Sequence, residues 1–236
     1  MSKKFKSDFS KKLELKDQNI IYSNENDFND FLITVGVPTY KRRDTLERAL
    51  KSLSKQTFRN FRVIVSDNDG ASKDTLEVIK KFHKNIPSLL LIGQEKNIGC
   101  LGNISFLLNC SSTEYFMWLA DDDEISENYI ETLYKILESH PDALTAMGSW
   151  KKMKNEYEGE IIKKPSYSSS SLIIRITNHV LGFQNDSAFY GLHRRKIIRN
   201  AKFEGFFPPN NKVISNYCYL ILFDILLRGK ILFSEE

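Results

Sequence analysis

The sequence has few cysteines, no long hydrophobic run and little net charge, and each shortage excludes a class of protein. Its three cysteines, Cys100, Cys110 and Cys218, are an odd number without the spacing of a metal site, so no disulfide framework is expected. The apolar run at residues 219–227 is interrupted by Asp224 and is well short of the ~20 residues that span a bilayer. The net charge is only +4 and the basic residues are dispersed, which does not indicate nucleic-acid binding.

The N-terminus also lacks the apolar core of a secretory signal peptide, because residues 1–16 are polar and rich in lysine. We therefore expect a cytoplasmic protein, and the mild positive charge is compatible with peripheral attachment to an anionic membrane surface. At 236 residues, the chain fits one domain. Residues 1–30 are interpreted as an N-terminal arm, 31–150 as a regular α/β half, and 151–236 as a less regular half that ends like a truncated chain.

A short apolar run at residues 115–120 ends in the consecutive acids Asp121, Asp122, Asp123 and Glu124. An apolar run of this length, bounded by polar residues, is typical of a buried strand. Carboxylates this close repel one another unless a cation or hydrogen-bond donors compensate them, and Mg²⁺ and Mn²⁺ prefer oxygen ligands. The alternative is that the acids only favour the N-terminus of the helix predicted before Pro141.

Five predicted strands recur at the spacing of βαβ units, which indicates a mostly parallel sheet with right-handed crossovers. We expect these strands at residues 31–37, 61–65, 89–92, 115–120 and 143–147. Because the carboxyl ends of parallel strands meet at one edge, the polar residues that follow them should lie beside the acids. These residues are Thr39, Tyr40, Asp67 and Asn97. Their shared position argues against a role of the acids in capping alone.

The second half of the sequence is less regular. A helix is predicted over residues 172–181, a strand over 187–192, a short basic helix over 194–200 and a long helix over 213–228. In the first half, Asp44 with Glu47 three residues later predicts a capping box at the start of a helix.

Four motifs, in order along the chain, resemble those of the family 2 glycosyltransferases, which have the nucleotide-diphospho-sugar transferase fold called GT-A. The motifs are VPTYKR at residues 37–42, VSDN at 65–68, EKNIG at 95–99 with Asn103, and LADDD at 119–123. The resemblance covers residues 31–150 well and the remainder in outline. It implies an α/β fold, with a Rossmann-like, mostly parallel central sheet flanked by helices and a less regular, acceptor-side C-terminal half.

The resemblance also implies a nucleotide-sugar donor at the strand ends. The donor-binding residues would be Pro38, Thr39, Tyr40, Arg42, Asp67, Asn97, Asp121 and Asp122. Asp67 would accept a hydrogen bond from the base, since a carboxylate is an acceptor and uracil presents an imide N–H. The acids resemble the family's DXD element, in which an aspartate coordinates Mn²⁺ or Mg²⁺ at the diphosphate. The acidic pair is either Asp121 with Asp123 or Asp122 with Asp123, so Asp123 is the expected metal ligand, with Asp121 as the second.

The catalytic base is harder to assign. Inverting members of the family carry an acid at the start of a late helix, which removes the proton from the acceptor hydroxyl. Residues 213–218 contain no acid, and the nearest carboxylates are Asp186, which we prefer as the base, and Asp224. His193, which precedes Arg194 and Arg195, is expected to contact the diphosphate or the acceptor.

The sequence thus predicts a metal-dependent transferase that moves a sugar, with inversion, from a UDP-linked donor to a hydroxyl of a growing surface glycan or lipid-linked saccharide. Two alternatives stay open. A sugar nucleotidyltransferase would use the same sheet edge, although residues 38–43 lack the glycines that its phosphate loop needs. A non-catalytic module that binds nucleotide sugar or glycan would explain the missing base.

Overall fold

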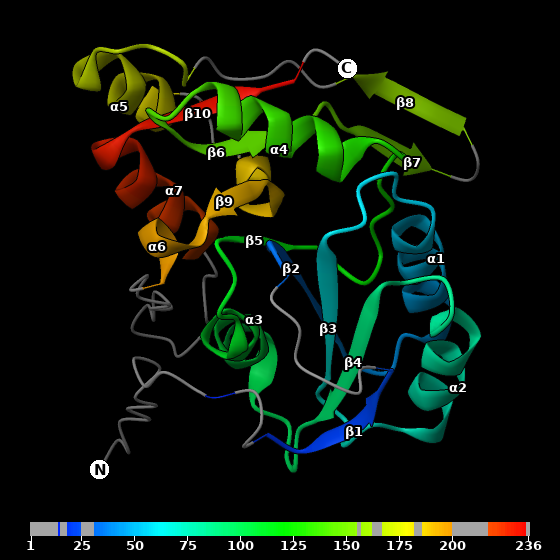
Figure 1. Ribbon diagram of the computed structural model, residues 1–236. Coiled ribbons are helices and arrows are strands. Elements are labelled where there is room, and N and C mark those ends of the chain that lie inside the picture. Colours follow the sequence, from blue (N-terminus) through cyan, green and yellow to red (C-terminus); the bar gives the residue numbers. More distant parts are fainter. Residues whose placement is uncertain are drawn as a thin grey trace, which may run out of the picture.

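The computed structural model describes residues 14, 18–24, 31–154, 157–161, 167–181, 186–199 and 217–234. Its centre is an eight-stranded sheet with the strand order β1-β4-β3-β2-β5-β9-β6-β10 (Figure 1). The strands are β1 (Ile20–Ser23), β2 (Ile33–Thr39), β3 (Phe61–Asp67), β4 (Ser88–Gly93), β5 (Tyr115–Trp118), β6 (Ala143–Met147), β9 (Leu192–Arg194) and β10 (Lys230–Phe233). A separate antiparallel pair is formed by β7 (Lys151–Lys154) and β8 (Tyr157–Ile161).

The sheet is mostly parallel, as predicted. Strand β2 pairs in parallel with β3 and β5, β3 with β4, and β6 with β10, whereas β1 and β9 run antiparallel to their neighbours. Strand β1 lies within the segment interpreted as an arm, yet it forms the edge of the sheet against β4. Its few apolar residues suffice because backbone hydrogen bonds to a buried neighbour hold an edge strand.

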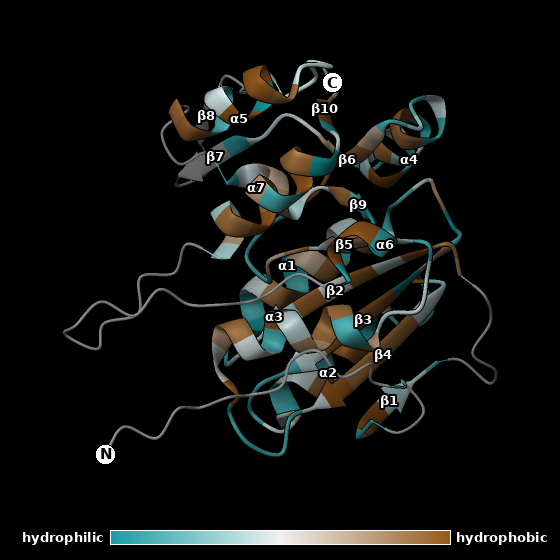
Figure 2. Cartoon of the chain, turned by 90° about the vertical axis from the view of Figure 1, so that its left-hand side faces the viewer, coloured by the Kyte–Doolittle hydropathy of each residue, from teal (hydrophilic) through white to brown (hydrophobic). Residues whose placement is uncertain are grey.

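Helices cover both faces of the sheet and bury its central strands. They are α1 (Arg43–Ser54), α2 (Lys73–Phe82), α3 (Gly99–Cys110), α4 (Tyr129–Ser139), α5 (Leu172–Leu181), α6 (Arg195–Ile198) and α7 (Tyr217–Arg228), with a 3₁₀ turn, η2 (Ser187–Tyr190). One apolar cluster joins α1, α2 and α4 to the sheet, and a second joins α3 and α7 to its other face. Every residue of β3 and β4 is buried, and the two strands are largely brown in Figure 2. Strands that are buried on both faces usually have nearly continuous apolar sequences.

Side chains of β5 alternate between the two clusters, because successive residues of a strand point to opposite faces. Tyr115 and Met117 belong to the cluster with α1, α2 and α4, whereas Phe116 and Trp118 belong to the cluster with α3 and α7. The indole of Trp118 stacks on the ring of Phe189, with centroids 4.3 Å apart. Strand β5 therefore anchors η2, from the second half of the chain, to the sheet that the first half builds.

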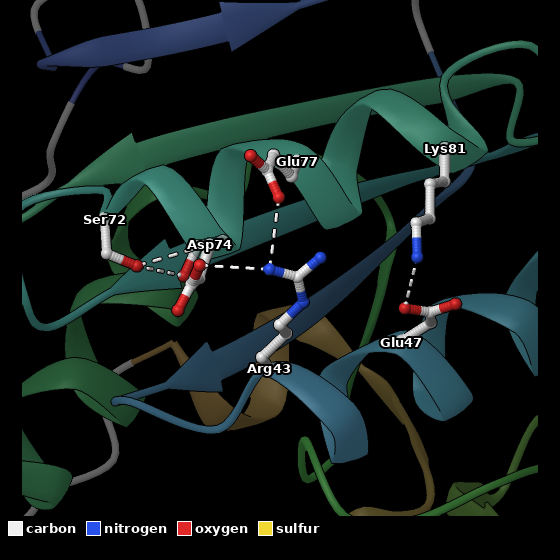
Figure 3. A network of polar contacts seen from close by, with 7 residues as sticks. Arg43, Glu47, Ser72, Asp74, Glu77 and Lys81 are labelled. Atoms are coloured by element: carbon white, nitrogen blue, oxygen red, sulfur yellow. Dashed lines mark hydrogen bonds and ion pairs between the residues drawn. The ribbon is translucent and has the colours of Figure 1, made fainter.

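Polar contacts at the surface join α1 to α2 (Figure 3). Arg43 contacts Asp74 and Glu77 at 3.0 and 3.1 Å, and Lys81 contacts Glu47 at 2.7 Å. The predicted capping box is wrong: α1 begins after Arg42, so Asp44 lies within the first turn, where its charge suits the helix dipole. Exposed ion pairs of this kind add little stability, so the apolar clusters hold the helices in place.

The predicted strand at residues 187–192 is also wrong. The chain forms η2 and then enters β9 only at Leu192. A Cβ at Gly191 would lie 2.5 Å from the carbonyl oxygen of Ala146, so the chain at Gly191 lies against β6. Stacking of Phe189 on Trp118 outweighs the strand preference of the aromatic pair at 189–190. The predicted helix at 213–228 is described from Tyr217 onward as α7. Among the described residues, no helix has the length and apolar character needed to cross a bilayer.

Candidate active site

The strand ends of β2 and β5 bring four of the predicted donor-site residues together: Thr39, Arg42, Asp121 and Asp122. The Thr39 hydroxyl donates a 2.8 Å hydrogen bond to Oδ2 of Asp121, and Nη1 of Arg42 lies 3.1 Å from Oδ1 of the same carboxylate. The same Arg42 nitrogen lies 2.9 Å from Oδ2 of Asp122. One guanidinium thus bridges two neighbouring acids, and their charges raise the pKa of Arg42. The expectation that the acids lie beside Thr39, at the carboxyl end of β2, is confirmed.

The three aspartates differ in how their charges are compensated. Asp121 is buried, and this burial raises its pKa, while the hydrogen bond from Thr39 and the charge of Arg42 oppose the rise. Asp123 is exposed, yet the protein atoms around its carboxyl remove part of its hydration and raise its pKa, and the charges of Asp122 and Asp121 raise it further. No cation or side-chain donor contacts Asp123 among the described residues. Its carboxylate is the uncompensated charge of the cluster.

Among the described residues, the acidic cluster alone does not make a complete site for a divalent cation. Within the described ranges, no three acid, histidine or cysteine side chains converge as a ready-made metal site. Mg²⁺ is usually held by one or two carboxylates together with substrate phosphates and waters. Asp123, which has no compensating partner, and Asp121, which shares its positive neighbour with Asp122, are oxygen donors suited to that arrangement.

Asp67, at the end of β3, supports the loop that follows it. Its carboxylate accepts backbone N–H bonds from Asp69 at 2.9 Å and from Ser72 at 3.0 Å, and the residue is completely buried. Ser72 in turn caps α2 by accepting a bond from the N–H of Thr75. The structure therefore places Asp67 at the predicted rim, with its oxygens turned into the loop over residues 67–72.

Asn97 lies beside Asn68, a residue whose role the sequence analysis missed. The Asn68 amide nitrogen donates to Oδ1 of Asn97 at 3.0 Å, and Oδ1 of Asn68 accepts the N–H of Ile98 at 2.9 Å. These bonds tie the ends of β3 and β4 together ahead of α3. The signal was the polar residue next to Asp67, because asparagine commonly bonds to nearby backbone groups in loops.

Tyr40 and Pro38 complete the predicted donor side. Tyr40 is 42% exposed, and the ammonium of Lys41 lies 5.2 Å from the centroid of its ring. Pro38 is part of β2 and pairs with Ser66 of β3. Tyr40, which follows Thr39 directly, thus has a partly exposed aromatic ring on which a planar group can stack.

His193 does not lie where the sequence analysis expected. It is completely buried, with Nδ1 2.8 Å from the Thr145 hydroxyl and Nε2 2.8 Å from the carbonyl oxygen of Phe189. Burial lowers the pKa of His193 to about 4, so the ring is neutral at physiological pH. The expectation that it contacts diphosphate or acceptor is wrong, because the ring cross-links β6, β9 and η2 inside the protein.

The two carboxylates considered as the base lie in different settings. Asp224 forms an exposed ion pair with Arg228 one turn along α7, at 3.0 Å. Asp186 is exposed and precedes η2. Burial is the largest cause of the raised pKa of Tyr190, and the charges of Asp123 and Asp186 both raise it further. Asp186 therefore lies near the same tyrosine as the end of the acidic cluster.

The sequence matches the Glycosyl transferase family 2 over residues 34–212. Glycosyltransferase GlyA of Streptococcus pneumoniae is 28% identical over 87% of this chain, which spans 30% of that relative. The GalNAc(5)-diNAcBac-PP-undecaprenol beta-1,3-glucosyltransferase of Campylobacter jejuni is 26% identical over 77% of this chain, which spans 58% of that relative. The chain thus covers less than two thirds of either protein.

Solved structures share the fold. TarS 1-349 of S. aureus in complex with UDP superposes with a TM-score of 0.65 at 18% identity, over 86% of this chain and 58% of that one. The mannosyltransferase PcManGT from Pyrobaculum calidifontis, in complex with GDP-Man and Mn²⁺, has a TM-score of 0.57 at 15% identity, over 88% and 55% of the two chains. The predicted GT-A fold is confirmed. With the family match spanning most of the sequence, the chain belongs to the glycosyl transferase family 2.

Proposed function

We propose that this protein transfers a sugar from a nucleotide-diphosphate donor, most simply a UDP-sugar, to a hydroxyl of a growing surface glycan or lipid-linked saccharide. The observation that carries the proposal is the rim where Thr39 and Arg42 meet Asp121, with Asp123 left uncompensated beside them. The transfer is proposed to be metal-dependent and inverting. The UDP complex of TarS and the GDP-Man and Mn²⁺ complex of PcManGT support a nucleotide donor and a divalent cation at this fold.

Asp123 and Asp121 would hold Mn²⁺ or Mg²⁺ in this proposal. The bound ion would neutralise the charge that develops on the departing nucleoside diphosphate. Thr39 fixes the orientation of Asp121 through its 2.8 Å bond, and Arg42 keeps the acids compensated before the donor arrives. A preset arrangement of this kind needs little reorganisation during the reaction.

Asp186 is the proposed base on the acceptor side. Its carboxylate would take the proton of the acceptor hydroxyl as that oxygen attacks the anomeric carbon, and the bond to the diphosphate oxygen breaks on the opposite face. General-base catalysis needs a carboxylate within hydrogen-bond reach of that hydroxyl. Two observations favour Asp186 over Asp224, which is ion-paired. Asp186 is exposed, and its charge raises the pKa of Tyr190, as does the charge of Asp123.

Titration calorimetry of UDP and GDP in the presence and absence of Mn²⁺ tests the proposal without depending on turnover. Wild-type protein is expected to bind one of them more tightly with Mn²⁺, and Asp123→Asn should remove that gain. The matched control is Asp74→Asn, which removes an exposed acid of α2. If neither nucleotide binds in the presence of Mn²⁺, or if the metal effect is unchanged in Asp123→Asn, the proposal is contradicted.

The released product separates this reaction from the alternatives. A glycosyltransferase releases a nucleoside diphosphate from the nucleotide sugar, whereas a sugar nucleotidyltransferase releases pyrophosphate. A non-catalytic binding module releases neither a nucleoside diphosphate nor pyrophosphate. Fractionation of cells into membrane and soluble parts would test the further proposal that the protein works in the cytoplasm with peripheral attachment to the membrane.

A further inference from the structure

A second charged site lies at the other end of β5 from the acids. It is a cavity of about 120 Å³ lined by Thr113, Glu114, Arg194, Arg195, Lys196 and Arg199. Residues 113 and 114 precede β5, whereas the acidic cluster follows it, and four strand residues span roughly 13 Å at ~3.3 Å each. A donor diphosphate held by the acids does not occupy this cavity, so its charges need a separate explanation.

The basic side chains of the cavity differ in the hydrogen bonds that they make within the protein. Arg194 is committed to the fold: its guanidinium donates to the carbonyl oxygens of Ala143 and Leu137, at 3.0 and 2.6 Å, and to the Tyr115 hydroxyl at 2.8 Å. Lys196 and Arg199 are exposed. Within the described ranges, neither has a side-chain hydrogen bond or ion pair, which leaves their donors available.

Arg195 is the unusual member of the group. Its Nε is buried without a hydrogen-bond partner, and no acceptor or acid contacts its guanidinium among the described residues. Burial lowers the pKa of Arg195, and the neighbouring charge of Arg199 lowers it further. Glu114 also lines the cavity, but it forms no ion pair with these cations in the described part of the chain. A half-buried guanidinium next to a second cation, without an anion, is unfavourable unless a ligand supplies the anion.

We infer that this cavity binds a phosphate group, free or carried by an anionic lipid head group. Arginine suits phosphate because its planar fork donates paired hydrogen bonds to two oxygens, and lysine adds a point charge. The cavity volume of about 120 Å³ exceeds the roughly 10–15 Å³ of the same measure that one water needs, so it has room for an anion of several atoms. The Thr113 hydroxyl already donates within the protein, so the guanidinium and ammonium groups supply the recognition.

The inference is tested with inorganic phosphate and the double variant Arg195→Gln/Arg199→Gln. Calorimetric titration at constant ionic strength should show saturable binding to wild-type protein and at least about tenfold weaker binding to the variant, since each charged hydrogen bond is worth about that factor. Lys80→Gln/Lys84→Gln loses the same charge from exposed positions on and after α2 and should bind phosphate like wild type. Absence of saturable binding to wild type, or an equal loss in the control, overturns the inference.

Thermal unfolding shows whether the arginine variant loses phosphate binding because it is misfolded. Without phosphate, the Arg195→Gln/Arg199→Gln variant should unfold at or above the wild-type temperature, because a half-buried cation without an anionic partner has been removed. Phosphate should raise the melting temperature of wild type and of the lysine control, but not that of the arginine variant. A phosphate-induced rise of equal size in all three proteins overturns the inference.

Co-sedimentation with vesicles identifies the source of the phosphate. Phosphatidylcholine vesicles with phosphatidic acid are compared with phosphatidylcholine alone. Binding to the acidic vesicles that the arginine variant loses assigns the site to a lipid phosphate. No vesicle binding together with binding of free phosphate assigns it to a soluble phosphate compound. Acidic-vesicle binding that persists in the arginine variant, with no binding of free phosphate, overturns the inference.

Discussion

The two halves of the molecule use polar side chains in opposite ways. In the first half, Thr39, Arg42 and Asp121 meet at the rim of the sheet, where the side chain of Arg42 is exposed. In the second half, the most deeply placed polar side chains, His179 and His193, hold helices and strands together inside the protein. Thr39, Arg42 and Asp121 are thus candidates for chemistry, whereas the two histidines are part of the packing.

The largest expected effect concerns Asp186. Unlike the two buried histidines of the second half, this acid is exposed, and we propose that it takes part in catalysis. Replacement by asparagine should lower the turnover number about 10²- to 10⁴-fold, the usual contribution of a general base. Binding of the nucleotide with Mn²⁺ should not change, because the donor site lies in the first half. Steady-state kinetics and calorimetry measure the two quantities. Turnover within about threefold of wild type would leave the second half without a catalytic residue.

The next effect concerns His193 and the stability of the protein in acid. The pKa of the folded-state ring is lowered to about 4 from the ordinary value of 6.5. As pH falls below 6.5 the unfolded chain binds a proton that the folded chain rejects, so stability present above pH 6.5 is lost on the way to pH 4. The loss is about 3.5 kcal/mol, at ~1.4 kcal/mol for each pKa unit.

Urea unfolding at pH 7 and at pH 4.5 measures this loss. His193→Gln should show a flatter pH dependence than wild type, whereas His83→Gln, at the C-terminal end of α2, should retain the wild-type slope. His179 contributes in the same direction, because burial lowers its pKa too, so some slope remains in the variant. An unchanged slope in His193→Gln would show that His193 is not the buried cross-link we describe.

Thr39 tests whether the rim in the first half is held together by its own polar contacts. Thr39→Val removes the donor to the buried Asp121 carboxylate while it keeps nearly the same shape. We expect a loss of about 2 kcal/mol in the free energy of unfolding, because a hydrogen bond to a charged group is lost. Thr39→Ser keeps the hydroxyl and serves as the control. If urea unfolding shows Thr39→Val to be as stable as wild type, the preset arrangement is contradicted.

The difference between the halves also explains what could be predicted from the sequence. The βαβ rhythm placed β2 to β6 within a few residues, because buried parallel strands appear as apolar runs. It placed Thr39 beside Asp121 for the same reason. The second half follows no such rhythm: η2 depends on the stacking of Phe189 on Trp118, which lies 71 residues away in the sequence.

His193 was misassigned because its neighbours in the sequence are basic, whereas its neighbours in space are Thr145 and the backbone of η2. A histidine beside two arginines looks like an anion site when only the sequence is known. The structure moves that role to Arg195 and Arg199, whose side chains face the cavity, and leaves the histidine inside. Local sequence does not reveal which of several adjacent polar residues points inward on a short strand.

The smallest expected effect concerns Asp224, the other acid considered as the base. Its carboxylate is exposed and pairs with Arg228 four residues later, and such a pair stabilises a helix by about 0.3–0.5 kcal/mol. Asp224→Asn should therefore lower the melting temperature by no more than about 2 °C and leave turnover within about threefold of wild type. Calorimetric melting and the kinetic assay used for Asp186→Asn provide the comparison. A tenfold or greater loss of turnover in Asp224→Asn would make Asp224 the better base and place the acceptor against α7.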